Sequence, residues 1–157
     1  MKGSRRILLW LVLALPAALM VGRFVSGEAL AMDLYHPSGE MSVRLMVLAL
    51  LPGPLADVFG PNRFLRAWLA IRRNLGVAAF GYAVLHLAIY TLDMQQLSAM
   101  LAELPIPGIW TGWLALLAMA IPAAISFDAA MRRLGRRWKT LQRLVYPAAL
   151  LSLVHWL

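Results

Sequence analysis

The sequence predicts an all-α protein, a polytopic membrane helix bundle with five transmembrane helices and a cytoplasmic N-terminus. Three observations predict this class: an apolar composition, five long apolar segments, and basic residues gathered in alternate connections. The chain of 157 residues is 62% hydrophobic and 14% charged, whereas soluble domains are about half apolar and a quarter charged. It has no cysteine, which excludes disulfides, thiolate metal sites and iron–sulfur clusters from this chain. We expect a single domain over residues 1–157.

The apolar segments predict the individual helices. A bilayer core requires roughly 20 apolar residues per helix. Segments that reach or approach this length are 7–25, 41–59, 75–92, 109–127 and 144–157. The first is interpreted as a retained helix, because no small-x-small cleavage site follows it. Pro16 and Pro122 lie inside two segments, where neighbouring helices can satisfy the backbone groups that proline leaves unpaired.

The basic residues predict the orientation. Thirteen of the 15 Lys and Arg residues precede the first helix or lie between the second and third or the fourth and fifth. They are Lys2, Arg5, Arg6, Arg63, Arg66, Arg72, Arg73, Arg132, Arg133, Arg136, Arg137, Lys139 and Arg143. The other two connections carry only acidic charges: Glu28, Asp33, Glu40, Asp93 and Glu103. The positive-inside rule therefore places the N-terminus in the cytoplasm, and this topology explains the net charge of +8 without nucleic acid. Residues 128–143 place apolar side chains at helical spacing among basic ones, as in a helix on the inner leaflet.

Two of the three histidines, His86 and His155, lie within predicted membrane helices. Each follows the leucine that begins its segment, Leu75 or Leu144, by eleven residues, which is about 16 Å along a helix. Both helices begin at the cytoplasmic face, so the two imidazoles share a depth past the midplane. A planar cofactor between them could be held by both.

The residues below each histidine are small. Steps of three or four residues lead back to Ala83, Ala79 and Gly76 from His86, and to Ser152 and Ala148 from His155. Such stripes leave room for a macrocycle or for a close helix contact. Two axial imidazoles on haem iron favour electron transfer over oxygen binding. Interhelical hydrogen bonding by each histidine, and proton or metal transport, are the alternatives.

Several motifs carry a resemblance to a known family. The stretch AMRRLGRRWKTLQRLVY followed by PAALLSLVHWL, together with DLYHPSGEMSVR, IRRNLG and AVLHLAIY, resembles the MsrQ/YedZ family. That family is the haem-binding membrane subunit of a periplasmic methionine sulfoxide reductase system, within the ferric-reductase-like transmembrane superfamily. The resemblance implies a b-type haem in the bacterial inner membrane, with His86 and His155 as iron ligands. It also implies electron flow from the quinone pool or a cytosolic flavin reductase to a periplasmic molybdoenzyme like MsrP. A flavin mononucleotide is implied as well, although no motif here identifies its site.

Two departures from the family shape the expectation. Gln142 stands where the family commonly has a histidine, and an amide does not ligate iron, so we expect one haem, in the outer half of the bilayer. Relatives normally continue into a sixth helix, whereas this sequence ends two residues after His155. The alternatives are a metalloreductase or quinone-linked cytochrome with another acceptor, and a non-redox structural subunit that has lost haem. No nucleophile–base pair or glycine-rich phosphate loop indicates a catalytic site.

Polar residues near the predicted membrane ends have two interpretations each. Arg44 is expected either to pair with a haem propionate or to pair with Glu40 four residues before it. His36 is placed in the outer loop, in the turn that enters the second helix, where Ser38 is expected to cap that helix. It is either a plain loop residue or a contact to the haem edge or a periplasmic partner. The arginines at 72–73 either anchor the topology or bind an anionic headgroup or phosphate.

Overall fold

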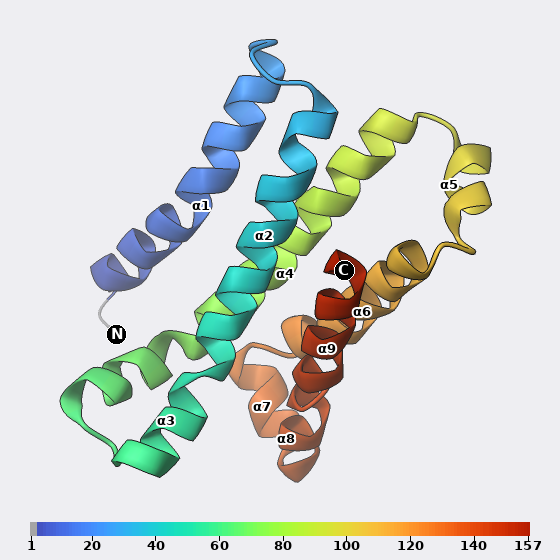
Figure 1. The fold of residues 1–157 in the computed structure, drawn as a ribbon. Coiled ribbons are helices and arrows are strands. Elements are labelled where there is room, and N and C mark those ends of the chain that lie inside the picture. Colours follow the sequence, from blue (N-terminus) through green and yellow to red (C-terminus); the bar gives the residue numbers. More distant parts are fainter. Residues whose placement is uncertain (1–2) are drawn as a thin grey trace. The chain divides into compact units, whose positions relative to one another are not determined.

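The computed structural model describes residues 3–157, and all of the regular structure in this range is helical (Figure 1). The predicted class, an all-α polytopic membrane protein, is confirmed. Lys2 lies outside the described residues. The chain divides into two compact units, residues 1–93 and 94–157, and each is described by itself. The single domain over residues 1–157 stays a prediction.

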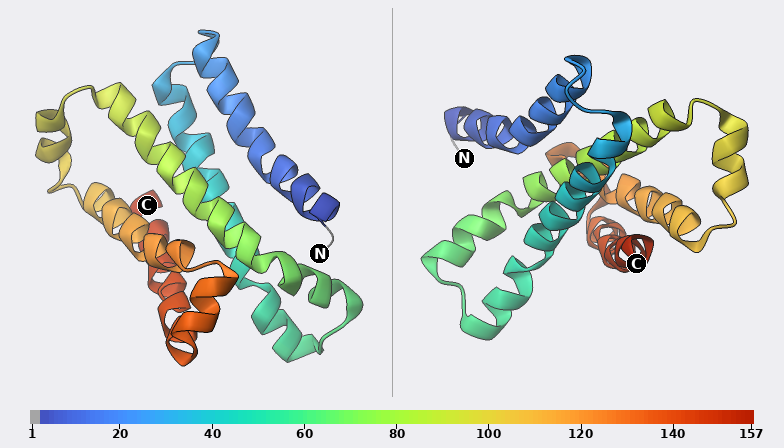
Figure 2. Two further views of the ribbon diagram at one scale, coloured as in Figure 1. Left: turned by 180° about the vertical axis from the view of Figure 1, so that it is seen from behind. Right: turned by 45° about the horizontal axis from the view of Figure 1, so that its top comes forward.

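The first unit contains four helices: α1 (Gly3–Val25), α2 (Ala31–Leu50), α3 (Pro52–Phe59) and α4 (Arg63–Met94). Pro52 begins α3 directly after α2, because a proline without an N–H is accommodated in the first turn of a helix. At the end where α1 leads into α2, a small core of Ala29, Ala31, Leu34 and Ile89 joins α2 to α4. The three long helices of this unit are seen from behind in Figure 2. Helix α1 buries none of its residues, as expected for a helix whose surface faces lipid.

A side chain from α4 compensates for the proline in α1. Pro16 lies inside α1 and cannot donate a backbone hydrogen bond. The Tyr82 hydroxyl accepts from the Ala17 N–H at 3.0 Å and donates to the Leu13 carbonyl at 2.8 Å. An uninterrupted α-helix would pair these two backbone groups with each other. Tyr82 therefore satisfies the two backbone groups beside the proline and links α1 to α4. Such side-chain partners are expected within a bilayer, where no water can pair with the backbone.

The predicted start of the second membrane helix is wrong by ten residues. Helix α2 begins at Ala31, so the stretch DLYHPSGE is helical and is not an outer loop. The Asp33 carboxylate accepts from the Leu30 N–H at 2.9 Å, which pairs one of the unsatisfied donors of the first turn. Ser38 consequently does not cap the helix but lies buried within it.

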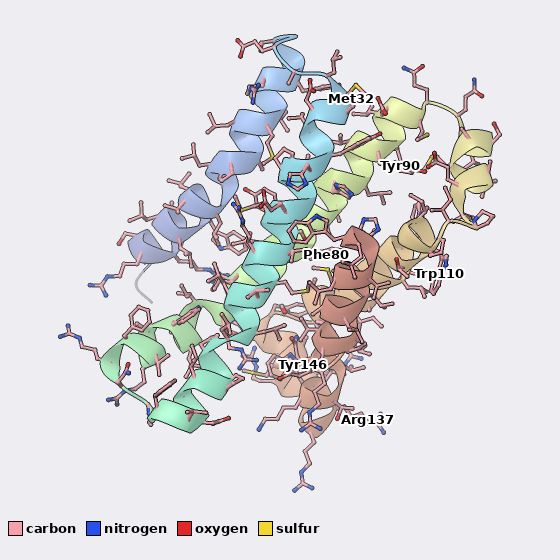
Figure 3. All side chains as sticks on the ribbon, viewed as in Figure 1. Met32, Phe80, Tyr90, Trp110, Arg137 and Tyr146 are labelled. Carbon is pink, nitrogen blue, oxygen red and sulfur yellow. The ribbon has the colours of Figure 1, made fainter. Side chains whose placement is uncertain are left out.

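The second unit consists of α5 (Leu97–Glu103), α6 (Pro107–Ala124), α7 (Asp128–Leu134), α8 (Arg136–Gln142) and α9 (Val145–Trp156). Helices α6 and α9 lie side by side along their length (Figures 1 and 2). The predicted helix over 128–143 is interrupted at Gly135, whose φ of 52° lies in the left-handed region. The Trp138 indole donates to the Ile125 carbonyl at 3.0 Å. Figure 3 shows Arg137 on α8 and Trp110 on α6.

The lengths of the helices agree with most of the predicted spans. Within residues 3–157, four stretches are long and apolar enough to cross a membrane: Gly3–Val25, Ala31–Phe59, Arg63–Met94 and Pro107–Ala124. The fifth predicted segment is helical as α9, but its 12 residues span only about 18 Å. That is less than a hydrocarbon core of about 30 Å.

Candidate histidine site

His86 is fixed to α2 through one edge of its ring. Its Nδ1 lies 3.1 Å from the Tyr35 carbonyl oxygen and 3.1 Å from the Ser38 hydroxyl. A Cβ built on Gly39 would lie 3.3 Å from Nδ1 and Cε1 of this ring. The imidazole therefore rests against the backbone of α2 at a residue without a side chain. Glycine permits this approach, since any other residue would place a carbon against the ring.

His155 is held by α6 in the same way. Its Nδ1 bonds to the Gly108 carbonyl oxygen. A Cβ on Gly112 would lie 2.7 Å from Nδ1 and Cε1 and 3.2 Å from Cγ. The ring thus sits closer to α6 than an alanine at position 112 would permit.

We call each helix segment that holds a histidine ring a cradle: residues 35–39 of α2 for His86 and residues 108–112 of α6 for His155. The two cradles share a third feature, a buried hydroxyl. Ser38 donates to carbonyl oxygens three and four residues before it, those of Tyr35 at 3.0 Å and Leu34 at 2.7 Å. Thr111 has the same relation to Gly108 at 3.0 Å and Pro107 at 2.7 Å. In each case the carbonyl three residues back is the one that the histidine also contacts.

The sequences of α2 and α6 repeat around these cradles. A hydroxyl residue and a glycine, Ser38–Gly39 and Thr111–Gly112, are each followed by a buried methionine seven residues after the glycine. These methionines are Met46 and Met119. On the histidine helices, Ala79 and Ala148 lie seven residues before His86 and His155, and both are fully buried. The expected small residues at these two positions therefore make close helix contacts, and the Ser42 hydroxyl donates to the Ala79 carbonyl at 2.9 Å.

The carbonyl partners determine which ring nitrogen carries the proton. A carbonyl oxygen only accepts, so each Nδ1 carries the proton in these hydrogen bonds. In a neutral imidazole the lone pair is then on Nε2, the form in which histidine binds metals. Metal-bound histidines usually donate their other N–H to a carbonyl, a carboxylate or water, and this fixes both tautomer and ring direction. Each histidine is therefore held in the way that is usual for a histidine that binds a metal through Nε2.

No cluster of protein ligands accompanies either histidine. Among residues 3–157, no group of three or more His, Cys, Asp or Glu residues could hold a metal ion. A bare metal ion bound by the protein alone requires about four ligands in a zinc site and more for calcium. A metal that brings its own equatorial ligands needs only axial donors from the protein. Each of the two histidines could serve as one such donor.

An aromatic and acidic group lies beside His86, toward the end of α4. The Tyr35 ring contacts His86 edge-to-face, with centroids 6.2 Å apart, and is tilted against Tyr90 at 6.4 Å. The Tyr35 hydroxyl donates to the Asp93 carboxylate at 2.6 Å. Tyr90 lies on α4 (Figure 3). Tyr35 thus supplies the carbonyl that holds His86 and, through its ring, reaches an exposed carboxylate.

Other residues singled out from the sequence have ordinary partners. Arg44 donates to Glu40 at 2.6 Å, one of its two expected interactions, and His36 approaches the same carboxylate at 3.9 Å. Gln142 donates to the Pro122 carbonyl at 3.0 Å and lies 3.3 Å from the Ser126 hydroxyl. The Gln142 side chain therefore links α8 to α6. The arginines at 72–73 lie within α4 instead of in a connection.

Sequence reasoning identified both histidines but missed what holds them. The acceptors are backbone carbonyls. Every residue has one, so no residue type in the sequence marks these positions. The paired glycines and hydroxyls were visible, and aligning SGEMSVRLM with TGWLALLAM would have shown the repeat.

Comparison with known proteins agrees with the resemblance stated above. Residues 38–153 match the family described as ferric reductase like transmembrane component. A heme-binding subunit MsrQ of protein-methionine-sulfoxide reductase from Cronobacter sakazakii is 38% identical over 134 residues, 81% of this chain and 64% of that protein. The subunits of the same name from Klebsiella pneumoniae strain 342 and Rhizobium meliloti are 37% and 35% identical, over 81% and 76% of this chain and 64% and 55% of their own lengths.

The chain thus spans less than two thirds of the length of these curated relatives. No solved structure matches it significantly. The predicted similarity to MsrQ is confirmed, and the helices together with the family make this a multi-pass membrane protein. The chain belongs to the family of ferric reductase like transmembrane components.

Proposed function

We propose that this chain is a haem b electron-transfer subunit of the bacterial inner membrane, with Nε2 of His86 and Nε2 of His155 as the two axial ligands. The observation that supports this most is the shared state of the two rings. Both donate Nδ1–H to a backbone carbonyl and rest on a glycine. In this tautomer the nitrogen that would ligate iron is Nε2.

The residues fit haem in their chemistry. Neutral imidazole ligates both ferric and ferrous iron, and two such ligands fill both axial positions. When bound, haem supplies a one-electron iron couple in the membrane. The chain's part is to orient each imidazole, to exclude water with the apolar surfaces of its helices, and to set the electron density of each ligand. One haem is proposed, because Gln142 is engaged with the Pro122 carbonyl and is no substitute for a second histidine pair.

Arg44 is proposed as a propionate contact in the loaded protein. Its guanidinium pairs with Glu40, but the side chain is 64% exposed, and an exposed ion pair of this kind contributes only about 0.3–0.5 kcal/mol. A propionate could therefore share or replace the carboxylate of Glu40 as its partner.

The proposed direction of electron flow is the one that the family resemblance implies, and the names of the relatives support the partnership with a reductase. These are heme-binding subunits of a protein-methionine-sulfoxide reductase. The proposed donor is the quinone pool or a cytosolic flavin reductase, with flavin mononucleotide as a second cofactor. The proposed acceptor is a periplasmic molybdoenzyme that reduces methionine sulfoxide.

The test is an absorption spectrum of the purified protein, oxidised and then reduced with dithionite. Wild-type protein is expected to show a Soret band and sharp reduced α and β bands. His86→Ala and His155→Ala should each lose the bis-histidine spectrum. His36→Ala is the matched control, because His36 is an exposed residue of α2. A featureless spectrum from protein produced with ample haem would refute the proposal and favour a non-redox structural subunit.

A second acceptor is suggested by the description of the family, ferric reductase like transmembrane component. In that alternative the same haem would reduce ferric chelates. Reduced protein, mixed under anaerobic conditions with a ferric chelate or with the molybdoenzyme, distinguishes the two by the rate of haem reoxidation.

A further inference from the structure

The hydroxyls of Ser38 and Thr111 occupy the same place in the two cradles, between a histidine and the backbone. Each lies 3.0 Å from the carbonyl oxygen to which the histidine Nδ1 also bonds. Both residues are buried, at 0% and 2% exposure. The arrangement recurs on two helices with different flanking sequences, and nothing about a membrane helix requires a hydroxyl at these positions.

A carbonyl oxygen that accepts two hydrogen bonds is a weaker acceptor for each of them, since the donors share its electron density. The hydroxyl therefore moderates the bond from Nδ1–H. A stronger bond would pull the Nδ1 proton toward oxygen and make the ligand more basic and imidazolate-like. A more basic ligand favours ferric over ferrous iron.

At His86 the Ser38 oxygen has an additional effect. It lies 3.1 Å from Nδ1, the same distance as the Tyr35 carbonyl oxygen. The hydroxyl proton points to the carbonyls of α2, with Leu34 the nearer at 2.7 Å. Nδ1–H is thus divided between two acceptors, which again keeps its bond to the carbonyl weak.

We propose that Ser38 and Thr111 are positioning residues that weaken the Nδ1–carbonyl hydrogen bonds of His86 and His155 and so keep both rings as neutral, moderately basic imidazoles. This rests on the proposed function for its consequence, a raised haem reduction potential. The hydrogen bonds themselves exist in the chain without haem. The proposal and the haem assignment can therefore fail separately.

The variants are Ser38→Ala and Thr111→Val, which remove each hydroxyl and leave a side chain of similar or smaller size. Ser152→Ala is the matched control. Its hydroxyl is also buried and bonds to a carbonyl four residues back, that of Ala148 at 2.9 Å, but this carbonyl is not the one that His155 contacts. Ser38→Thr and Thr111→Ser keep the hydroxyl and should restore wild-type behaviour.

The first readout needs no haem. The chain has three histidines, so protein labelled with ¹⁵N-histidine in lipid nanodiscs gives few ring signals, and His36→Asn identifies one of them. The Nδ1–H proton of His86 should move downfield in Ser38→Ala, and that of His155 in Thr111→Val. Neither should move in Ser152→Ala.

The second readout is the midpoint potential of the haem-loaded protein. Each deletion is expected to favour ferric iron by about threefold, because it strengthens one hydrogen bond made by a ligand. At 59 mV per tenfold for one electron, this is a fall of roughly 30 mV per hydroxyl. The two effects should add in the double variant, since the residues lie in different cradles.

Unchanged or upfield Nδ1–H signals in protein of normal helical content would overturn the proposal, whatever the haem does. Downfield shifts with no fall in potential would also overturn it, because ligand basicity would then not depend on these bonds. Downfield shifts in a protein that binds no haem at all would sustain the hydrogen-bond role and refute the haem assignment instead.

Discussion

The closest approach in either cradle, between His155 and Gly112, permits a direct test by Gly112→Ala. An added Cβ would stand 2.7 Å from two ring atoms, whereas ordinary contact begins near 3.4 Å. The ring must therefore move by at least 0.7 Å, the difference between these distances. Ligand geometries tolerate displacements of about 0.5 Å. We expect Gly112→Ala to lose most of its haem.

Two other glycines make the comparison quantitative. At Gly39 the same Cβ would lie 3.3 Å from His86, so Gly39→Ala requires a shift of about a tenth of an ångström and should keep its haem. At Gly81 nothing lies within 4 Å. Gly81→Ala should therefore raise stability by about 0.5–1 kcal/mol through helix propensity alone.

The two assays are haem content per chain and the free energy of unfolding in mixed micelles. Overpacking costs about 1–3 kcal/mol, so Gly112→Ala should be destabilised by about 1 kcal/mol after the gain in helix propensity. The order of haem content should be Gly81→Ala and Gly39→Ala near wild type, with Gly112→Ala far below. Equal haem content and stability in Gly112→Ala would show that the glycine is not what admits the imidazole, and would refute the reasoning.

Three further predictions concern hydrogen bonds made by single side chains. Tyr82→Phe leaves the Ala17 N–H and Leu13 carbonyl without the hydroxyl that joins them, and should cost about 1–3 kcal/mol of unfolding free energy, measured in mixed micelles. Tyr35→Phe loses the exposed bond to Asp93; it should cost about 1 kcal/mol or less and leave the haem spectrum unchanged. Gln142→Leu removes the amide from the Pro122 carbonyl; it should lower stability by about 1 kcal/mol without changing the number of haems in a pyridine haemochrome assay.

The helices were largely predictable from the sequence because apolar length alone identifies a membrane span. The exception is instructive. The stretch DLYHPSGE contains a proline, a glycine and two acids, which indicate a loop in water, yet α2 begins before it at Ala31. Its Ser38 and Gly39 contact the ring of His86, so these residues lie in a packed helix despite their low helix propensity. Gly135 likewise interrupted a helix that amphipathic spacing had predicted as continuous.

The two histidines could be singled out from the sequence because ionisable residues in membrane helices are rare. Their partners could not, because carbonyls belong to every residue. What distinguishes the carbonyls of Tyr35 and Gly108 is only that a glycine four residues later clears the space for a ring. The informative sequence signal was therefore the repeat of a hydroxyl–glycine pair, and not any single residue.

The choice of neutral carbonyls over carboxylates as the partners of both rings bears on the proposed redox role. A carboxylate beside Nδ1 would make the imidazole strongly basic and would hold the iron in the ferric state. It would also bury a charge in a low-dielectric region, at a cost of several kcal/mol. A carbonyl orients the imidazole ring without adding a charge. The hydroxyl that donates to the same carbonyl further limits the basicity of the imidazole. An electron carrier between two partners needs an iron that is reduced and oxidised with similar ease, and imidazoles whose Nδ1 bonds to a backbone carbonyl suit that requirement.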